Sequence, residues 1–453
     1  MANDPTIAAI RFGAGLSPVS GAQADAAALM AELAAPDAQI AAFPVMPSTE
    51  VWSQALAVKA LRRARQQNEP GAVARVKAAR AAVAEREVAG LVSFMQRGVA
   101  APIGFRERLQ AFWANHFTVV NKTGTYPSGP AAFADEALRP NLTASFATML
   151  RAVVTHPMML VYLDQVSSVG PKSVFGQRTG KGLNENLGRE LMELHTLGVG
   201  APYTQTDVRQ LAKLLTGLGF DPKTGFVFRA NWAEPGPKTV LGKTYDGPPR
   251  LETIYAALDD IAVRPETAHH LCLKLATHFV ADTPDADLVQ HMTAAYSASG
   301  GELGKVYAAM LDHPAAWALP YQKVRLPYDY LVAGLRALGV APQTLSDLSP
   351  HDQRKLILGP LQLMGQPFEK QPEPNGWPEA AQAWVQPQML AARIQWAMAV
   401  PAAVMPDLPD PRDFVRTALA DAAGPALVTA AAQAETRRAG VGIILASSDF
   451  NRR

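Results

Sequence analysis

The sequence predicts an all-α protein, a large multi-helix body with one short β-hairpin or extended loop at about residues 220–250. Alanine is abundant from end to end, and apolar residues recur mostly at helical rather than alternating spacing. Only the segment 220–250 combines several glycines and prolines with alternating aromatic residues, Phe226 and Phe228. We expect one domain over 1–453, with 1–250 and 251–453 as a finer division into two subdomains.

Each helix is predicted from apolar spacing and from the residues that start or stop it. Thr204 and Asp207 have the spacing of a capping box, which opens a helix with Val208 and Leu211 on one face. In chain order, the expected helices lie at 55–95 (a pair with a turn at Pro70-Gly71), about 105–117, 142–153 (ended by Pro157), 184–197, from 204 onward, and from about 251 and 265. The Pro-rich segment 366–387 holds Trp377 and Trp384, so we expect an ordered strap packed on the body and not a free linker.

Composition excludes several classes of protein. Lys and Arg number 42 against 40 for Asp and Glu, so the net charge of +2 does not indicate a nucleic-acid binder. The single cysteine, Cys272, cannot form an internal disulfide or a cysteine-rich zinc site. The sequence contains no Walker loop, dinucleotide fingerprint, HExxH or GxSxG motif, which disfavours the usual nucleotide enzymes and serine hydrolases.

The segment Met1 to Pro18 lacks the basic and apolar regions of a signal peptide. No stretch of the sequence approaches the roughly 20 apolar residues that a membrane span needs. We therefore expect a cytoplasmic protein without a membrane span.

The helix expected at 184–197 carries the most informative polar cluster. Helical spacing places its leucines on one face and Asn186, Arg189, Glu190 and Glu193 on the opposite face. Two carboxylates three residues apart, beside an Arg, could bind a metal, hold a hydroxylated substrate or pair an acid with a base. The alternative is a solvated face with an Arg189–Glu193 ion pair, worth about 0.3–0.5 kcal/mol.

Two histidines are further candidates. His116 shares the apolar stripe of its helix and should point inward, as hydrogen-bonded structure or as a preoriented ligand or base. His195 lies beside the apolar face of the 184–197 helix, where a satisfied core histidine is the commoner outcome. His269, His270 and His278 have no carboxylate at ligand spacing, so we interpret them as structural.

The run from 184 to 219, NENLGRELMELHTLGVGAPYTQTDVRQLAKLLTGLG, closely resembles the signature of the bacterial DUF1800 family, which is named for its unknown function. Shorter motifs agree with that family in the same order. They are Arg11-Phe12-Gly13, FWANHF at 112–117, HPMMLVYLD at 156–164, KTVLG at 238–242, PNGWP at 374–378 and SSDFNRR at the C-terminus. The resemblance covers essentially the whole chain.

The resemblance implies a predominantly helical protein and adds candidate residues. Those that match the family's motifs are Asn115, His116, Asn184, Glu185, Asn186, Arg189, Glu190, Glu193, Tyr203 and Asp207. Similar proteins usually carry His where this sequence has Ala233. Many family members are encoded beside DUF1501 proteins, which resemble sulfatases and alkaline phosphatases. One alternative is therefore that this protein binds a DUF1501-like partner. In that case the protein would be exported to the periplasm together with the partner.

These observations lead to the hypothesis of an enzyme that performs hydrolysis or elimination on a polar substrate, such as a saccharide or a modified peptide. Glu190 and Glu193 would be acid/base or metal-binding carboxylates, His116 a base or ligand, and Arg189 an anion clamp. Substrate-binding candidates are Asn115, Asn184, Asn186, His195, Tyr203, Asp207 and the Ala233 position. The cofactor is unidentified, with a divalent metal as one candidate. The alternatives are a non-catalytic partner of a DUF1501-like enzyme and a metal- or haem-dependent oxidase.

Overall fold

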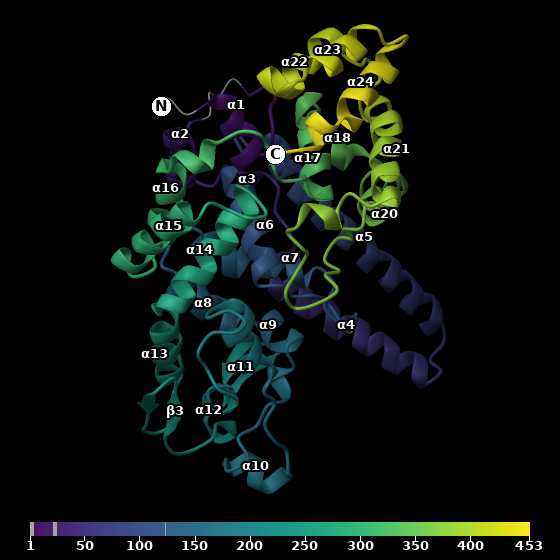
Figure 1. The fold of residues 1–453 in the computed structure, drawn as a ribbon. Helices are drawn as coiled ribbons and strands as arrows, with labels where there is room; N and C mark the ends of the chain where they lie inside the picture. Colours follow the sequence, from purple (N-terminus) through teal and green to yellow (C-terminus); the bar gives the residue numbers. More distant parts are fainter. Residues whose placement is uncertain (1–3, 21–24, 123) are drawn as a thin grey trace.

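A computed structural model describes residues 4–20, 25–122 and 124–453 of the chain. Helices account for 64% of the protein and strands for 4%, which confirms the all-α prediction (Figure 1). The first three residues of the N-terminal segment considered above lie outside the described residues. In the described ranges, no helix combines the length and the apolar character that crossing a membrane requires.

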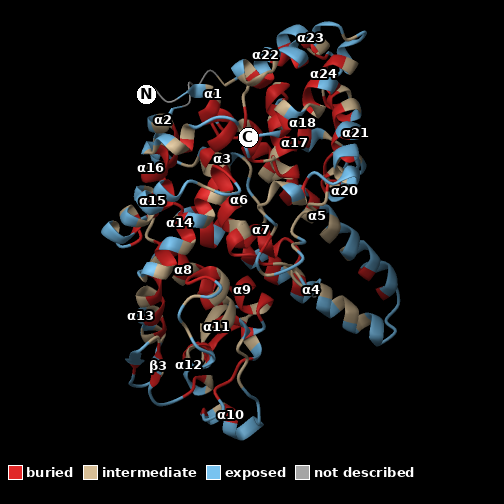
Figure 2. Cartoon of the chain, viewed as in Figure 1, coloured by how far each residue is buried: buried red, intermediate tan, exposed pale blue. Residues whose placement is uncertain are grey.

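The N-terminal part ends in the two long helices that the sequence predicts. Gly71 joins them with a φ of +71°, a left-handed conformation that glycine adopts without a Cβ clash. The pair projects from the body as a helical arm, and residues at its far end are exposed (Figures 1 and 2). The elements are α1 (Pro5–Ile7), η1 (Ala8–Phe12), α2 (Ala26–Ala34), α3 (Ala38–Ala42), α4 (Ser48–Gln66) and α5 (Ala72–Ala100).

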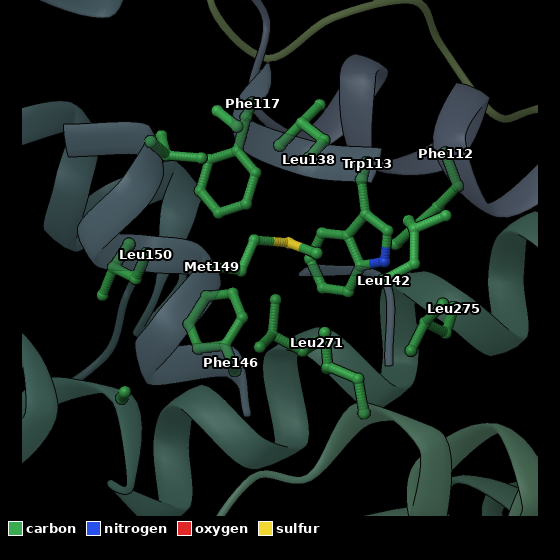
Figure 3. Close-up of a cluster of buried hydrophobic side chains, with 14 of the residues drawn as sticks. Phe112, Trp113, Phe117, Leu138, Leu142, Phe146, Met149, Leu150, Leu271 and Leu275 are labelled. Atoms are coloured by element: carbon green, nitrogen blue, oxygen red, sulfur yellow. The ribbon is translucent and has the colours of Figure 1, made fainter. Parts of the chain in front are cut away.

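The centre of the molecule is an apolar core between two groups of helices. Trp113 of α6 and Phe117, the residue after this helix, stack near Phe146 and Met149 of α8. Leu271 and Leu275 of α14 close the far side (Figure 3). The first group is α6 (Phe105–His116), α7 (Gly129–Phe133), η2 (Ala134–Leu138), η3 (Arg139–Asn141), α8 (Phe146–Thr155), α9 (Pro157–Tyr162) and η4 (Gln165–Ser167). The second is α13 (Leu251–Ala262), α14 (Pro265–Phe279), α15 (Ala286–Ser299), α16 (Leu303–Asp312) and η7 (Pro314–Trp317).

The segment expected to hold one hairpin contains two. Strand β1 pairs antiparallel with β2, and β3 pairs antiparallel with β4. The capping box at Thr204 and Asp207 is present at the start of α12, as predicted. The elements of this region are α10 (Val174–Thr179), α11 (Asn186–Glu190), η5 (Leu191–His195), α12 (Gln205–Leu214), β1 (Leu218–Asp221), β2 (Gly225–Phe228), η6 (Ala230–Trp232), β3 (Lys238–Val240) and β4 (Lys243–Tyr245).

The C-terminal helices follow, with the Pro-rich segment between α20 and α21. Trp384 is buried, and its ring packs edge-on against Trp377 at 6.1 Å, so this segment is the ordered strap that the sequence predicts. The elements are α17 (Pro327–Ala337), α18 (Pro342–Asp347), α19 (Pro350–Gln353), η8 (Arg354–Leu358), α20 (Gly359–Leu363), η9 (Ala381–Ala383), α21 (Pro387–Val404), α22 (Pro411–Leu419), η10 (Ala420–Ala422), α23 (Pro425–Ala432), α24 (Arg437–Ala446) and α25 (Ser448–Asn451).

Buried hydrophobic residues of the described chain fall into two clusters. The larger runs from the N-terminal region through α16, and the smaller joins α5 to α17 and the C-terminal helices. Helix α5 thus ties the arm to the C-terminal part. The expected division into subdomains at residue 250 stays a prediction, because packing alone does not show which parts fold independently.

Candidate functional site

The signature helix is not one regular α-helix. It is α-helical over Asn186–Glu190 and then widens into a π turn over Leu191–His195. Leu187 and Leu191 are buried, while Glu190 and Glu193 are half-buried on the other face, as helical spacing predicts. Single π turns inside α-helices occur frequently at functional sites. This π turn begins directly after Arg189 and Glu190 and contains Glu193.

Arg189 is held between two carboxylates. Its Nη1 lies 3.4 Å from Glu193 Oε1, and its Nη2 lies 3.5 Å from Glu185 Oε2. Gln205 of α12 completes the set, since it accepts a hydrogen bond from Arg189 at 3.1 Å and donates one to Glu185 at 2.8 Å. The side chains of both carboxylates are about a third exposed. The predicted Arg189–Glu193 pair therefore exists, within a partly solvated network.

Glu190 differs from its two neighbouring carboxylates. Within the described residues it makes neither a hydrogen bond nor an ion pair. Burial raises the pKa of its carboxyl, the charge of Glu193 raises it further, and Arg189 and Lys122 oppose both effects. Folding therefore disfavours the charged form of the Glu190 carboxyl, and this group is only half-buried. A carboxyl in such surroundings is suited to proton transfer.

Two side chains from other elements interact electrostatically with Glu190. Burial, and then the charge of Glu190, raise the pKa of the Tyr162 phenol to about 12. Lys122 Nζ lies 4.2 Å from the centre of the Tyr162 ring and donates to that residue's carbonyl oxygen at 3.1 Å. Burial, and then the charge of Glu193, raise the pKa of the Tyr203 phenol, while Arg189 lowers it. We call Lys122, Tyr162, Glu190, Glu193, Arg189 and Tyr203 the signature face.

The other polar residues of the signature shape the backbone. Asn184 Oδ1 accepts a hydrogen bond from the Asn186 amide at 2.8 Å and so fixes the start of α11, while the Asn186 side chain is exposed. Asp207 accepts from the Thr204 amide at 2.9 Å and from the Leu241 amide at 2.8 Å. It therefore fastens the β3–β4 turn to α12.

His116 points inward, as the apolar stripe predicts, and lies against the buried side of the signature helix. Its Nε2 is 3.1 Å from the carbonyl oxygen of His195, to which it donates, and its Nδ1 is buried without a partner in the described chain. Burial lowers the pKa of His116 well below its ordinary value, and that of His195 to about 3. Both rings are therefore neutral at pH 7. None of the interactions of Glu190 reaches either ring.

Asn115 and Ala233 face other parts of the molecule. The Asn115 side chain donates to the Trp377 carbonyl at 3.1 Å and accepts from the Trp377 amide at 2.6 Å, so it anchors the strap. Ala233 is buried at the base of the hairpins, where its Cβ lies against Gly217. It borders a small cavity with Leu214, Phe228, Lys238 and Tyr245, and no carboxylate of the signature face lines that cavity.

A buried charged cluster was missed by the sequence analysis. The face of α14 carries His270, Lys274 and His278 at intervals of four residues, and it packs against Arg108, Phe112 and His116 of α6, spaced in the same way. His278 Nδ1 donates to Glu379 Oε1 of the strap at 2.8 Å, and its Nε2 accepts from Arg108 at 3.1 Å. We call this set, with Lys323 and Asp329, the α6–α14 seam.

The carboxylates of the seam come from distant segments. Glu379 follows its partner His278 by 101 residues in the sequence. Asp329 follows its partner Arg108 by 221 residues. The Arg, Lys and His residues that α6 and α14 contribute to the seam can be recognised in the sequence from their spacing of four residues. No local sequence pattern indicates which carboxylates pair with them. In the described ranges, no group of three or more His, Cys, Asp or Glu side chains is arranged to hold a metal ion.

The fold and the signature face together define a helical protein with a half-buried carboxylate pair where an α-helix passes into a π turn. The chain belongs to the DUF1800 family, described as proteins of unknown function, whose model matches residues 7–452. This confirms the resemblance seen in the sequence. No curated protein and no solved structure matches the chain.

Proposed function

We propose that this protein is an enzyme that uses Glu190 to transfer a proton on a polar, hydroxylated substrate such as a saccharide or a modified peptide. One observation carries the proposal. Glu190 and Glu193 are neighbouring carboxyl groups in unlike environments, because Arg189 pairs with Glu193 while Glu190 has no hydrogen-bond partner in the described chain. Two neighbouring carboxyl groups with unlike partners and unlike burial are the usual basis for an acid and a base in one site.

The roles follow from these surroundings. The raised pKa of Glu190 favours its protonated form, so Glu190 donates a proton to the leaving oxygen of the substrate. Glu193, which pairs with Arg189, accepts a proton from water in a hydrolysis or from a carbon in an elimination. Lys122 attracts negative charge, and the half-buried Tyr203 offers a ring face and a hydroxyl to a sugar or peptide, while the buried Tyr162 supports Lys122 from behind.

His116 takes a positioning role in this proposal. Its hydrogen bond to the His195 carbonyl holds the end of the π turn from the buried side. Asn184 and Asp207 fix the start of α11 and the β3–β4 turn in the same indirect way.

The test is activity against a panel of glycosides, uronic-acid glycosides and peptides, with Glu190→Gln as the critical variant. We expect a loss of about 10²–10⁴-fold in kcat, the usual value of a general acid, with unfolding temperature unchanged or raised. Glu252→Gln is the matched control, since Glu252 is an exposed helical carboxylate on α13. Full activity of Glu190→Gln on a substrate that the wild type processes would overturn the proposal.

Elemental analysis and a visible spectrum of the purified protein separate acid–base chemistry from the metal-assisted and haem alternatives. A stoichiometric divalent metal that is lost in both Glu190→Gln and Glu193→Gln would assign the two carboxylates as ligands. A haem absorption band would favour the oxidase alternative.

A second candidate function, docking to a DUF1501-like enzyme, has one observation in its favour. The arm of α4 and α5 projects from the body (Figure 1), and residues 55–87 contain eight Lys and Arg against three Glu. A projecting basic arm is complementary to an acidic surface on a partner protein. Export together with such a partner would place this protein in the periplasm. Without such a partner, we propose that the protein is located in the cytoplasm. Co-purification that is abolished by reversing the charges of Arg62, Arg63 and Arg65 would support this function.

A further inference from the structure

The strap, residues 366–387, covers a cavity that no residue of the signature face lines. It lies where the two hydrophobic clusters meet, between α6, α7, α17 and strap residues 366–377, and it has a volume of about 160 Å³. An apolar cavity of roughly 150 Å³ is large enough to hold a benzene molecule, whereas about 10–15 Å³ holds one water. This space is therefore the size of a small ring, well beyond an ordinary packing defect.

The outer wall of the cavity is held in place. Asn115 makes two hydrogen bonds to the backbone of Trp377, and Gln366 accepts one from the Tyr328 amide at 2.8 Å. A Cβ on Gly376 would come within 2.4 Å of the Asn115 carbonyl oxygen, so only glycine allows the strap this close to α6. The strap residues that line the cavity are half-buried, so the strap separates the cavity from solvent.

Most of the lining is apolar and aromatic. The side walls come from Phe94, Phe133, Phe368, Leu361, Val119 and Pro130. The polar groups at the inner end are already bonded, since Glu107 pairs with Arg139 at 2.7 Å, Gln110 donates to Asp135 at 2.8 Å and Asp329 pairs with Arg108. They offer a ligand little unused hydrogen-bonding capacity.

Two strap residues do have unused capacity. Glu369 and Gln371 both line the cavity, and each has a buried side-chain oxygen without a hydrogen-bond partner in the described chain. An unpaired buried polar atom costs roughly 1–3 kcal/mol, which a ligand that bonds to it would recover. Glu369 also has a φ of +53°, a strained conformation of the kind found at ligand clamps.

We propose that this cavity binds an uncharged monocyclic aromatic molecule that bears a hydroxyl group. The ring fills the apolar part, and the hydroxyl donates to Gln371 and accepts from Glu369. Burial, followed by the charge of Glu87, raises the pKa of Glu369 to about 8, so this carboxyl is largely protonated at pH 7 and can donate. The site is independent of the signature face.

The test uses phenol, benzene and benzylamine as probes, with binding followed by calorimetry on the full chain. We expect phenol to bind one to one and at least about tenfold tighter than benzene, because its hydroxyl makes hydrogen bonds that benzene cannot make. Glu369→Leu should lower that preference, since only the bond to Gln371 then remains, while Glu369→Gln, which keeps a neutral donor and acceptor, should retain most of it. Glu373→Gln is the matched control, since Glu373 is an exposed carboxylate of the same strap.

A space-filling variant tests the location. Ala114 lines the cavity from α6 and is half-buried, so Ala114→Leu should fill part of the space and weaken phenol binding at least tenfold. Ala147→Leu, at a half-buried helical position of α8, is the control and should bind normally. Unfolding temperatures confirm that both variants fold.

Three results would overturn the proposal. Absence of binding by all three probes would remove the site, and phenol binding that survives Ala114→Leu would place the ligand elsewhere. Benzylamine that binds tighter than phenol at pH 7 would show a cation site in place of a neutral one.

Discussion

The signature face and the α6–α14 seam contain similar residues in opposite surroundings. On the signature face, Arg189, Glu185 and Glu193 form ion pairs with side chains about a third exposed. In the seam, Arg108 and His278 are almost fully buried, and Glu379 keeps 19% exposure. A buried charge is tolerated only with a partner, whereas a partly solvated one can change protonation at low cost. The comparison favours a structural role for the seam, and it is consistent with the proton transfer that we propose for the signature face.

The largest expected effect is the loss of a seam anion. Glu379→Ala leaves His278 and Lys323 without their shared carboxylate, and breaking a buried pair costs about 3–5 kcal/mol. Denaturant unfolding at pH 7 measures this change in the free energy of unfolding. A cost below 1 kcal/mol would contradict the structural role of the seam.

The same residue should give an acid-dependent signal. Burial alone would raise the pKa of Glu379, but His278 and Lys323 lower it to about 2 from 4.5. A carboxyl with a lowered pKa stabilises the fold fully above its unfolded value, and this stability is lost as the pH falls from 4.5 through 2. The difference in stability between the wild type and Glu379→Ala should therefore shrink over that range.

An intermediate effect of opposite sign is expected at Lys274. This lysine has no hydrogen bond or ion pair among the described residues, and burial lowers its pKa from 10.5 to about 8. Lys274→Met should stabilise the protein by about 1–3 kcal/mol at pH 7. Because folding disfavours the charged form, the wild type gains stability as the pH rises from 8 to 10.5, so the advantage of Met should fade there. An unchanged or lower unfolding temperature for the variant at pH 7 would refute this.

The smallest effect is expected on the signature face. Arg189→Gln removes two ion pairs, and partly exposed pairs contribute about 0.2–1 kcal/mol each at most. We expect a change in unfolding free energy below about 1 kcal/mol, and less in 0.5 M salt. A loss as large as that of Glu379→Ala would erase the contrast between the two regions.

Local pattern was sufficient for the helices and for the direction of their faces. The turn at Pro70-Gly71, the capping box at Thr204 and the inward His116 all depend on residues within one or two turns of each other. The π turn at 191–195 was not predicted, since its residues have ordinary helical spacing and the widening depends on tertiary packing. The bond between His278 and Glu379 joins segments 101 residues apart, and the expectation that His278 lacks a carboxylate considered only its own helix.

The candidate site was predicted in part. Glu190, Glu193, Arg189 and Tyr203 lie together, as the signature suggested, while His116, Asn115 and Ala233 each face a different part of the structure. The catalytic and binding roles of these residues stay predictions. The cavity beneath the strap could not be predicted, because its walls come from six separate segments of the chain.

The most direct test of the account is a titration of the Glu190 carboxyl by nuclear magnetic resonance, which needs no substrate. The account predicts a midpoint above the ordinary value of 4.5, since burial and then Glu193 raise this pKa. In Glu193→Gln the midpoint should fall part of the way towards 4.5 and remain above it, because burial is the larger cause. A Glu190 carboxyl that titrates at or below 4.5 in the wild type would contradict the claim that the signature face supplies a proton donor.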